Sequence, residues 1–554
     1  MGLFSRKPKT PRPLTKDSAS FDSDNSHNIS IGRSSNNKSV RSNTLNFNTN
    51  SRTSASSLGG LQSPLTPMTP YLPKVNLPKP PDPSLDAAGY LRSLGAVRER
   101  CKVITEKALA NQLNHFDVDL DKFPDVVQFV CRIIKRDYDA PFNSIPGHGR
   151  YQHFAVGGRD RIAHLMSTFD ATIDNTEKCR RLIDLFLVSV LLDAGAGTEW
   201  SFKSADSGKV YRRSEGLAIA SLEMFKAGIF SGDPNNRYQV DKDGLRNLTV
   251  DQLAKGLQSR PGNEVAGLEG RSQLLLRLGD ALAEKKDFFG ETGRPGNMID
   301  YLLAHPTTQA SSSPIIVLPV LWNVLMSGLA PIWPSSRTAI NGVSLGDAWP
   351  CAAMPQVPQR NRTTSSGSSP PTFSPFPSTT HSQAGSGATE AWEAILPFHK
   401  LTQWLTYSLM QPMQSILKIQ FAGTELLTGL PEYRNGGLFV DLGVLTLKEN
   451  DMERGLENYK NHSNRTGTKG VEVAPMFEPG DDVIVEWRGV TVGFLDKLCA
   501  DVNVALREEL AGGELTLAQL LEAGSWKGGR EIAEVSRPNT KEPPILIDSD
   551  GTVF

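Results

Sequence analysis

The chain has 554 residues and a formal net charge of −1, with 59 Lys and Arg residues against 60 Asp and Glu residues. This length exceeds one ordinary domain, and the balanced charge gives no reason to expect a polyanionic partner such as nucleic acid. Five cysteines stand apart without a C-x-x-C pair, which is typical of a reducing compartment and argues against a structural zinc site.

Composition separates segments that can bury a core from segments that cannot. Residues 1–82 form a basic tail rich in Ser, Asn and Pro, and residues 351–390 form an insertion rich in Ser, Thr and Pro. Both hold too few apolar side chains to fold, so we expect them to be disordered. Residues 83–350 and 391–554 are then two parts of one helical body. The longest apolar runs are too short to span a membrane, which predicts a soluble cytoplasmic or nuclear protein.

The first part of the body begins with helical patterns. Apolar residues recur at helical spacing over residues 126–134 (VVQFVCRII), which predicts a helix with one buried face. A glycine-rich loop follows over residues 144–161, in which histidines, arginines and aromatic residues are interleaved, among them His153 and Arg161. This loop matches neither the P-loop nor the dinucleotide-binding fingerprint.

Residues 181–192 are apolar nearly all round, which predicts an interior helix. Asp193 follows directly, at the helix end where the dipole disfavours a negative charge, so a nearby cation or donor must compensate it. We therefore regard Asp193 as a candidate functional acid, with Glu199 and Trp200 close by in the chain. The alternative is an Asp193 that only bonds backbone amides of the glycine-rich turn.

Charged residues that are candidates for the functional site also stand at the predicted starts of two further helices. Ser214 is predicted to cap a helix that runs to Phe225, a role that explains Ser214 but neither Arg213 nor Glu215. Arg271 opens another helix, whose leucines at 274, 275, 278 and 282 lie on its inner side.

Beyond the insertion, a helix is predicted to start at Pro397 and to break at Pro412. His399, Gln403 and Tyr407 are four residues apart and form one stripe of hydrogen-bonding groups. We interpret this stripe as the wall of a polar pocket; a buried structural network is the alternative.

Residues 427–437 (LTGLPEYRNGG) place a carboxylate, a phenol, a guanidinium and an amide in consecutive positions between a proline and a glycine pair. Proline restricts the backbone and glycine permits angles closed to other residues. We interpret the stretch as a rigid, partly buried turn that directs these side chains into a cavity. The alternative is a structural turn in which Glu432 and Arg434 satisfy each other.

Further on, residues 483–487 (VIVEW) predict a short strand, before amphipathic helices over 492–510 and 515–521.

Carboxylates beside aromatic residues and arginines therefore recur along the chain. Carboxylates that activate water and stabilise a developing cation suit glycosidic cleavage, because its transition state resembles an oxocarbenium ion. Arginines can clamp a phosphate group. The zinc-protease, nucleophile-elbow and Walker motifs are missing from the sequence.

Four blocks strongly resemble the uracil-catabolism protein family of fungi and bacteria, a domain of unknown function. They are residues 191–197 (LLDAGAG), 213–217 (RSEGL), 400–408 (KLTQWLTYS) and 428–437 (TGLPEYRNGG). The resemblance covers residues 83–554. It implies a role in a pyrimidine-degrading route that opens the uracil ring on ribose phosphate and ends in urea. The unassigned step there is the release of urea from a ribosylurea phosphate, an N-glycosidic hydrolysis.

A weaker resemblance links residues 432–434 and 443–445 to queuosine-salvage ribohydrolases, which cleave a base from ribose. Their helical fold is akin to that of DNA glycosylases. Glu432 stands where those enzymes have Asp, and their following Pro-Gln pair is missing here. This resemblance implies that Glu432 is the catalytic acid.

We therefore expect a mostly α body with a few short strands that acts as an N-ribosyl hydrolase without metal or cofactor. Its expected partner is a small, phosphorylated ribosyl substrate, with no nucleic acid or membrane partner and with contacts to other enzymes of the route as an option. An amidohydrolase acting on a ureido intermediate, or a non-catalytic partner of the ring-opening enzyme, is the alternative.

Glu432 and Asp193 are the expected catalytic carboxylates, one to stabilise the ribosyl cation and the other to activate water. Arg161, Arg213 and Arg434 are the candidates for phosphate. The full set of expected substrate-binding residues is His153, Arg161, Glu199, Trp200, Arg213, Glu215, Arg271, His399, Lys400, Gln403, Trp404, Tyr433, Arg434 and Asn435.

Overall fold

The computed structural model describes residues 75–193, 195–197, 199–355, 392–467 and 472–548. The chain divides into two compact units, Met1–Tyr71 and Leu72–Phe554, and the described residues all belong to the second. The predicted disordered tail up to residue 74 and the predicted insertion from 356 to 390 lie outside the described residues.

Short pieces of both predicted segments belong to the folded unit. Val75 and Leu77 pack against the core, and Cys351, Ala353 and Met354 are buried within it. The boundaries drawn at residues 82 and 351 are therefore misplaced by several residues. Composition averaged over a long polar stretch hides a few apolar side chains at its edge.

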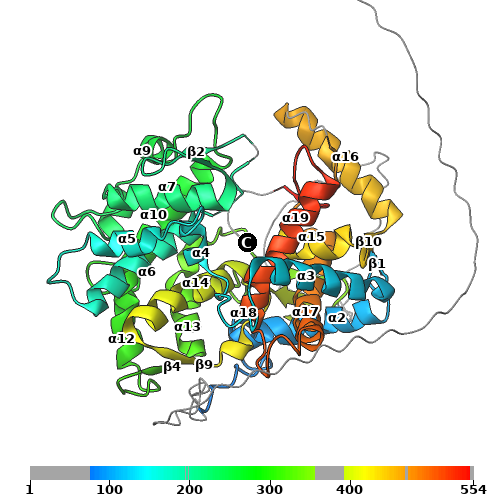
Figure 1. The fold of residues 1–554 in the computed structure, drawn as a ribbon, viewed down its shortest axis with the longest axis horizontal. Coiled ribbons are helices and arrows are strands. Elements are labelled where there is room, and N and C mark those ends of the chain that lie inside the picture. Colours follow the sequence, from blue (N-terminus) through cyan, green and yellow to red (C-terminus); the bar gives the residue numbers. More distant parts are fainter. Residues whose placement is uncertain (1–74, 194, 198, 356–391, 468–471, 549–554) are drawn as a thin grey trace, which may run out of the picture. The chain divides into compact units, whose positions relative to one another are not determined.

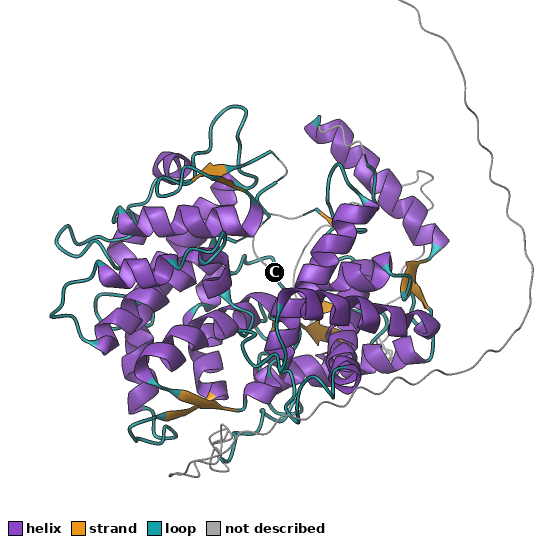
Figure 2. Ribbon diagram, in the orientation of Figure 1, coloured by secondary structure: helices purple, strands orange, loops and turns teal. Residues whose placement is uncertain are grey.

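Helices dominate the described residues, and the predicted mostly α fold is confirmed (Figure 2). Before the insertion they are α1 (Ala87–Leu91), α2 (Leu94–Leu109), α3 (Phe123–Asp137), α4 (Arg150–Phe154), α5 (Arg161–Ser167), α6 (Asn175–Leu191), α7 (Arg213–Lys226), α8 (Lys242–Arg246), α9 (Val250–Gly256), α10 (Leu268–Glu284), α11 (Lys286–Phe289), α12 (Met298–Ala304) and α13 (Leu318–Gly328). After it come α14 (Lys400–Leu417), α15 (Tyr433–Asp441), α16 (Glu449–Thr466), α17 (Asp482–Ala505), α18 (Leu517–Leu520) and α19 (Trp526–Ser536). Every helix among the described residues is too short or too polar to cross a membrane.

The described strands are short and pair only in twos. The antiparallel pairs are β1 (Phe116–Val118) with β10 (Leu445–Leu447), β2 (Phe202–Lys203) with β3 (Val210–Tyr211), β5 (Ala339–Ile340) with β6 (Val343–Ser344), and β7 (Ala348–Pro350) with β8 (Ile395–Pro397). The parallel pairs are β4 (Ile315–Val317) with β9 (Gln420–Ala422), and β11 (Met476–Phe477) with β12 (Leu546–Ile547). Two pairs matter for the site, because β7–β8 joins the two ends of the predicted insertion and β11–β12 holds the C-terminal segment.

The helices form two groups within this unit (Figure 1). In one group, α6 packs along α14, α10 packs against α8, and α7 lies against α4 and α6. In the other, α17 lies against α2 and α3, and α15 against α19. One large hydrophobic core is shared by both groups, so buried apolar side chains hold them together.

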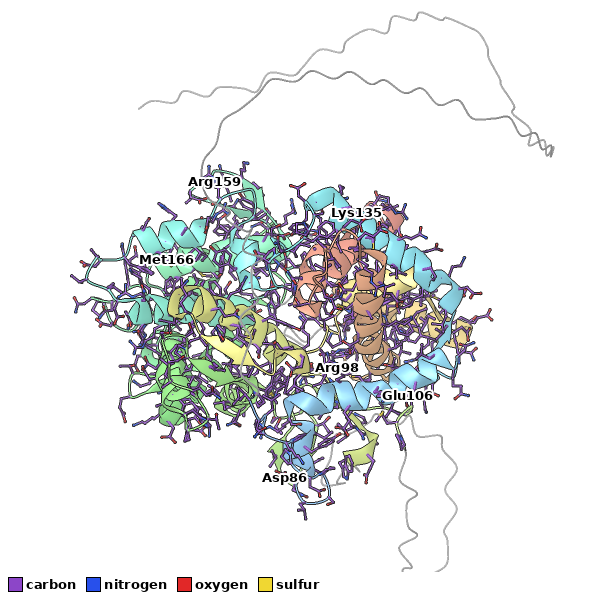
Figure 3. All side chains as sticks on the ribbon, turned by 60° about the horizontal axis from the view of Figure 1, so that its bottom comes forward. Asp86, Arg98, Glu106, Lys135, Arg159 and Met166 are labelled. Atoms are coloured by element: carbon purple, nitrogen blue, oxygen red, sulfur yellow. The ribbon has the colours of Figure 1, made fainter. Side chains whose placement is uncertain are left out.

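Arg98 on α2, which Figure 3 labels, ties the second group to the segment that leads into α15. Its Nε lies 2.7 Å from Asp496 Oδ2 on α17, and its terminal nitrogens donate to the carbonyls of Glu425 and Leu427 at 2.7 and 2.6 Å. An arginine that bonds a carboxylate and two carbonyls at once restrains three segments together.

Three predicted local structures are wrong. Residues 483–487 are not a strand but the first turns of α17, because a short buried apolar run does not reveal its own periodicity. Pro412 does not break α14, which continues to Leu417 because the buried contacts on both sides outweigh one lost hydrogen bond. The predicted turn at 427–437 contains the start of α15, where consecutive polar residues suit the free amides of a first turn.

A buried ion pair connects the parts of the chain that begin α14 and α15. Arg488 on α17 bonds both carboxylate oxygens of Asp347, at 2.8 and 2.7 Å, and both side chains are almost fully buried. Asp347 Oδ2 also accepts a hydrogen bond from the backbone amide of Lys400, and Arg488 Nε donates to the carbonyl of Pro431. Burial alone would raise the pKa of Asp347, but the Arg488 guanidinium holds it well below its usual range.

We predict that Asp347→Asn lowers the free energy of unfolding by about 3–5 kcal/mol, because Arg488 then stays buried without a counter-charge. Urea unfolding of the full chain measures this loss. Asp496→Asn is the matched control: it breaks the partly exposed pair with Arg98, and a loss of about 1 kcal/mol or less is expected. Equal losses in the two variants would contradict the prediction.

Candidate functional site

A cavity of about 280 Å³ lies where four helices begin or end. Its wall includes α4, the segment after α6, the first residues of α7 and of α14, the N-cap and first residues of α15, one face of α19 and the C-terminal segment around residues 542–547. These segments are far apart in the sequence, and helix ends supply most of the polar groups.

Nine predicted site residues line this cavity: His153, Asp193, Arg213, Glu215, Lys400, Trp404, Glu432, Tyr433 and Arg434. Both expected catalytic carboxylates are among them. The other seven predicted residues do not reach its wall, and for most of them the structure gives a packing role.

The predicted stripe on α14 turns out to be a buried network, which was the alternative interpretation. His399 Nε2 lies 2.8 Å from the carbonyl oxygen of Leu91, and both Gln403 and Tyr407 bond to Thr428. The reason is helical geometry: successive residues point about 100° apart, so Lys400 faces the cavity while its neighbour His399 faces the core.

Trp200 and Arg271 support the wall from behind. Trp200 is buried beneath α7, where a Cβ at Gly216 would lie 2.9 Å from its ring. Arg271 is buried and donates to the carbonyls of Leu192 and Gly195, so it holds the turn after α6. Both residues are large and buried, so a packing role explains why they are there, and no ligand contact is needed.

The remaining three predictions also fall outside the cavity. Glu199 is exposed, and Asn435 is buried, where it donates to the carbonyl of Leu430 and accepts from Ser525. Arg161 lines a separate cavity and donates to the carbonyls of the loop before it. The predicted phosphate role of Arg161 therefore does not belong to the cavity that holds the carboxylates.

Asp193 has the compensating cation that its helix-end position requires. Arg150 is fully buried, and its Nη1 lies 2.8 Å from Asp193 Oδ2, while its Nε donates to Ser189. The other carboxylate oxygen, Oδ1, has no hydrogen-bond partner among the described residues. Asp193 is thus held in place by one oxygen, while its other oxygen is buried and makes no hydrogen bond in the described part of the chain.

Arg150 also determines which nitrogen of His153 carries the proton. Its Nη1 lies 3.0 Å from His153 Nδ1, and because a guanidinium can only donate, Nδ1 must be the acceptor. Burial, and secondly the Arg150 guanidinium, lower the pKa of His153 to about 4, so the ring is neutral near pH 7. The proton of the neutral ring then lies on Nε2, which makes no hydrogen bond with the described residues. His153 is therefore a neutral donor in the cavity wall.

Glu432 is the N-cap of α15. Its Oε1 and Oε2 accept hydrogen bonds from the amides of Asn435 and Arg434, at 2.6 and 3.0 Å. The Arg434 guanidinium instead donates to the carbonyl of Lys541, so the two side chains do not satisfy each other as the alternative interpretation required. Burial raises the pKa of Glu432 even though Lys400 and the two amides oppose that shift.

Lys400 is a buried cation that interacts with the charges of both carboxylates. Burial lowers its pKa, and the charges of Glu432 and Asp193 both oppose that shift. Its ammonium group makes no hydrogen bond or ion pair with the described residues. It is left available for a ligand placed between the two acids.

The sequence did not predict several of the residues that line the cavity. His148, Trp526, Arg530 and Glu542 all line the wall. The ring centroids of His148 and Trp404 are 4.6 Å apart, and those of His153 and Trp526 are 5.6 Å apart, so the rings form an aromatic wall. Trp526 and Arg530 are four residues apart on one helix. This spacing places them on one helical face and could have predicted that they lie together.

Ser214 is also in the wall, but it does not cap α7 as predicted. That helix starts two residues earlier than predicted, at Arg213, with Arg212 at its N-cap position and no side-chain cap. Arg213 and His399, at the starts of α7 and α14, both adopt left-handed backbone angles, with φ of 54° and 47°. Such strained non-glycine residues persist where the surrounding structure imposes them, often at functional sites.

Among the described residues, no group of three or more His, Cys, Asp or Glu side chains is arranged to hold a metal ion.

We predict a loss of stability in acid that depends on His153. Its pKa of about 4 lies below the value near 6.5 of an unfolded histidine, so its contribution is complete above pH 6.5 and is lost as the pH falls to 4. The loss attributable to this ring should be about 3 kcal/mol.

Urea unfolding at pH 6.5 and pH 4 measures it in three proteins. His153→Gln keeps an acceptor for Arg150 but does not titrate, so its stability should fall less than that of the unmodified chain. His164→Gln, at an exposed position, should behave like the unmodified chain. An unchanged pH dependence in His153→Gln would refute the assignment.

Comparison with known proteins supports the resemblance found in the sequence. A family model described as "Protein of unknown function (DUF1688)" matches residues 90–554. Uracil catabolism protein 4 of Lachancea kluyveri is 42% identical over 470 residues, which cover 84% of this chain and 98% of that protein. Protein urg3 of Schizosaccharomyces pombe is 41% identical over 472 residues, which cover 85% of this chain and 100% of that protein. The chain belongs to the DUF1688 family.

Proposed function

We propose that this protein acts in uracil catabolism as an N-ribosyl hydrolase that releases urea from a ribosylurea or ribosylurea phosphate. The place in uracil catabolism is inferred from the relative named uracil catabolism protein 4. The observation that carries the reaction is the presence of two differently held carboxylates, Asp193 and Glu432, in one cavity with Lys400.

The two carboxylates suit different tasks. Arg150 fixes Asp193 at one oxygen, so its free oxygen can lie beside the positive charge that develops on the ribosyl ring. Burial raises the pKa of Glu432, and a carboxyl group that holds a proton more readily suits proton exchange with water. Two acids with separate environments are the usual arrangement for glycosidic chemistry.

In the proposed reaction the bond between C1′ and the urea nitrogen breaks, and its electron pair leaves with urea. A water oxygen forms the new bond to C1′, while Glu432 takes a proton from that water. Glu432 then passes this proton to the departing urea nitrogen and returns to its carboxylate form. His153 can donate its Nε2–H to the urea oxygen, and Trp404 and Trp526 offer flat faces to the planar urea group. The products are intact urea and the free sugar.

A non-catalytic partner protein would not need these groups in one cavity, so the cavity favours an enzyme over that alternative. An amidohydrolase would break a C–N bond of the ureido group itself. The products therefore separate the three functions: urea with free sugar from the hydrolase, ammonia from the amidohydrolase, and neither from a partner protein.

The direct test uses the purified full chain with synthetic ribosylurea and with its 5′-phosphate. Urea is measured with urease and ammonia without it, and the released sugar is measured as reducing ends. We expect urea and sugar in equal amounts, with no ammonia before urease is added. Ammonia without free sugar would replace this proposal by the amidohydrolase.

We predict that Glu432→Gln lowers turnover roughly 100-fold or more, because a glutamine cannot exchange the proton. Its amide also faces a backbone N–H, so the weakened cap should lower the free energy of unfolding by about 1 kcal/mol. The assay above and urea unfolding measure the two effects separately.

Asp174→Asn is the matched control, since Asp174 caps α6 at its other end, far along the chain from Asp193. It should lose similar stability and keep its turnover. A Glu432→Gln protein that keeps wild-type turnover while losing stability would assign Glu432 to capping alone.

A further inference from the structure

Two arginines in the cavity wall, Arg213 and Arg434, form no ion pair with a carboxylate in the described part of the chain. Arg434 Nη1 donates to the carbonyl of Lys541 at 3.0 Å, and Arg213 Nη2 lies 3.5 Å from the same oxygen and 3.4 Å from the carbonyl of Thr540. Contacts of 3.4 and 3.5 Å are long for hydrogen bonds. Arg213 Nη1 is buried and has no hydrogen-bond partner among the described residues.

These two guanidinium groups are close enough to repel each other. Burial is the main cause of the lowered pKa of Arg213, and the charge of Arg434 is the next. Both side chains converge on one backbone carbonyl, which carries only a partial charge. Two cations brought together with so little compensation indicate that the cavity is built for an anion at this point.

The first turn of α7 adds donors at the same place. This helix has 14 residues, begins at Arg213, and has no side-chain cap from its N-cap residue, although the carboxylate of Glu215 bonds its own backbone amide. Ser214, in that first turn, lines the cavity beside Arg213 and Arg434. A helix N-terminus with free amides attracts anions, and a hydroxyl and two guanidinium groups complete the donor set.

The nearby acid does not cancel this positive charge. Glu215 lies in the same first turn, but Arg530 forms an ion pair with it. Although burial alone would raise the pKa of Glu215, the Arg530 guanidinium holds it below its usual value. The charge of Glu215 is therefore matched by Arg530. Glu542, which also lines the cavity, offsets part of the charge of Arg213, but it forms no ion pair with Arg213 or Arg434 among the described residues.

We propose that Arg213, Ser214 and Arg434, with the first turn of α7, form a subsite for the phosphate monoester of a ribosyl substrate. A phosphate monoester carries between about −1.5 and −2 charges near pH 7, which matches two guanidinium groups, whereas a carboxylate carries one. The identity of the attached sugar rests on the proposed function. The subsite itself does not, because it can be tested by binding alone.

The C-terminal segment orients these arginines. The carbonyls of Thr540 and Lys541 each accept from Arg213, and β12 of the same segment pairs with β11. The carbonyls thus occupy one side of the two guanidinium groups and leave the other nitrogens for phosphate oxygens. This arrangement selects a phosphorylated sugar over a free one.

The test is isothermal titration of the full chain with ribose 5-phosphate and with ribose. Arg213→Gln should weaken binding of ribose 5-phosphate roughly tenfold to hundredfold, the usual effect of removing a charged hydrogen bond. Arg212→Gln is the matched control, because it removes the same charge one residue away at an exposed position. It should bind ribose 5-phosphate as the unmodified chain does.

Arg213→Lys keeps the charge but loses the planar fork, so it should bind with intermediate affinity and serves if Arg213→Gln fails to fold. Thermal melting of each variant checks folding. Equal binding of ribose and ribose 5-phosphate, or equal weakening by the changes at Arg212 and Arg213, would overturn the subsite.

The two proposals fail in different ways. If the chain binds ribose 5-phosphate through Arg213 but hydrolyses neither ribosylurea nor its phosphate, the hydrolase is refuted and the subsite stands. If both substrates are hydrolysed with the same KM, the hydrolase stands and the subsite is refuted.

Discussion

The buried pair between Asp347 and Arg488 is the constraint on which the arrangement of the cavity depends. The carboxylate accepts from the amide of Lys400 at the start of α14, and the guanidinium donates to the carbonyl of Pro431 just before Glu432. One ion pair therefore sets the positions of a cation and an acid that stand at the starts of two different helices. Because both charges of the pair are buried, neither partner can leave without a large loss of stability.

The cavity then combines groups that are restrained with groups that are not. Asp193 is held by Arg150, Glu432 by two backbone amides, and Glu215 by Arg530. The cations Lys400, Arg213 and Arg434 have no carboxylate within ion-pair distance among the described residues. Restrained acids with unmatched cations suit a ligand that carries its own negative charge and develops a positive charge at the reacting carbon. The proposed substrate, a ribosyl phosphate that loses urea, has both properties.

The sequence predicted the helical body and the two acids because their signals are local. Apolar spacing marked the buried faces of α3, α6 and α10, and a carboxylate at the end of an interior helix marked Asp193. The same local reasoning failed where the signal was ambiguous: a five-residue apolar run became the start of α17, and four polar residues in a row became the first turn of α15. In both cases the packing of the segment against its neighbours in the fold decided the secondary structure.

The sequence by itself determined that the chain folds as helices, that it resembles the uracil-catabolism family, and that Glu432 and Asp193 stand at polar sites beside glycines. Only the tertiary structure decided which neighbours face the cavity, since successive residues on a helix point in different directions. It placed Lys400 and Trp404 in the wall and His399 and Gln403 in the core. It also brought Trp526, Arg530 and the C-terminal segment to the site, because contacts between distant segments leave no periodic trace in the sequence.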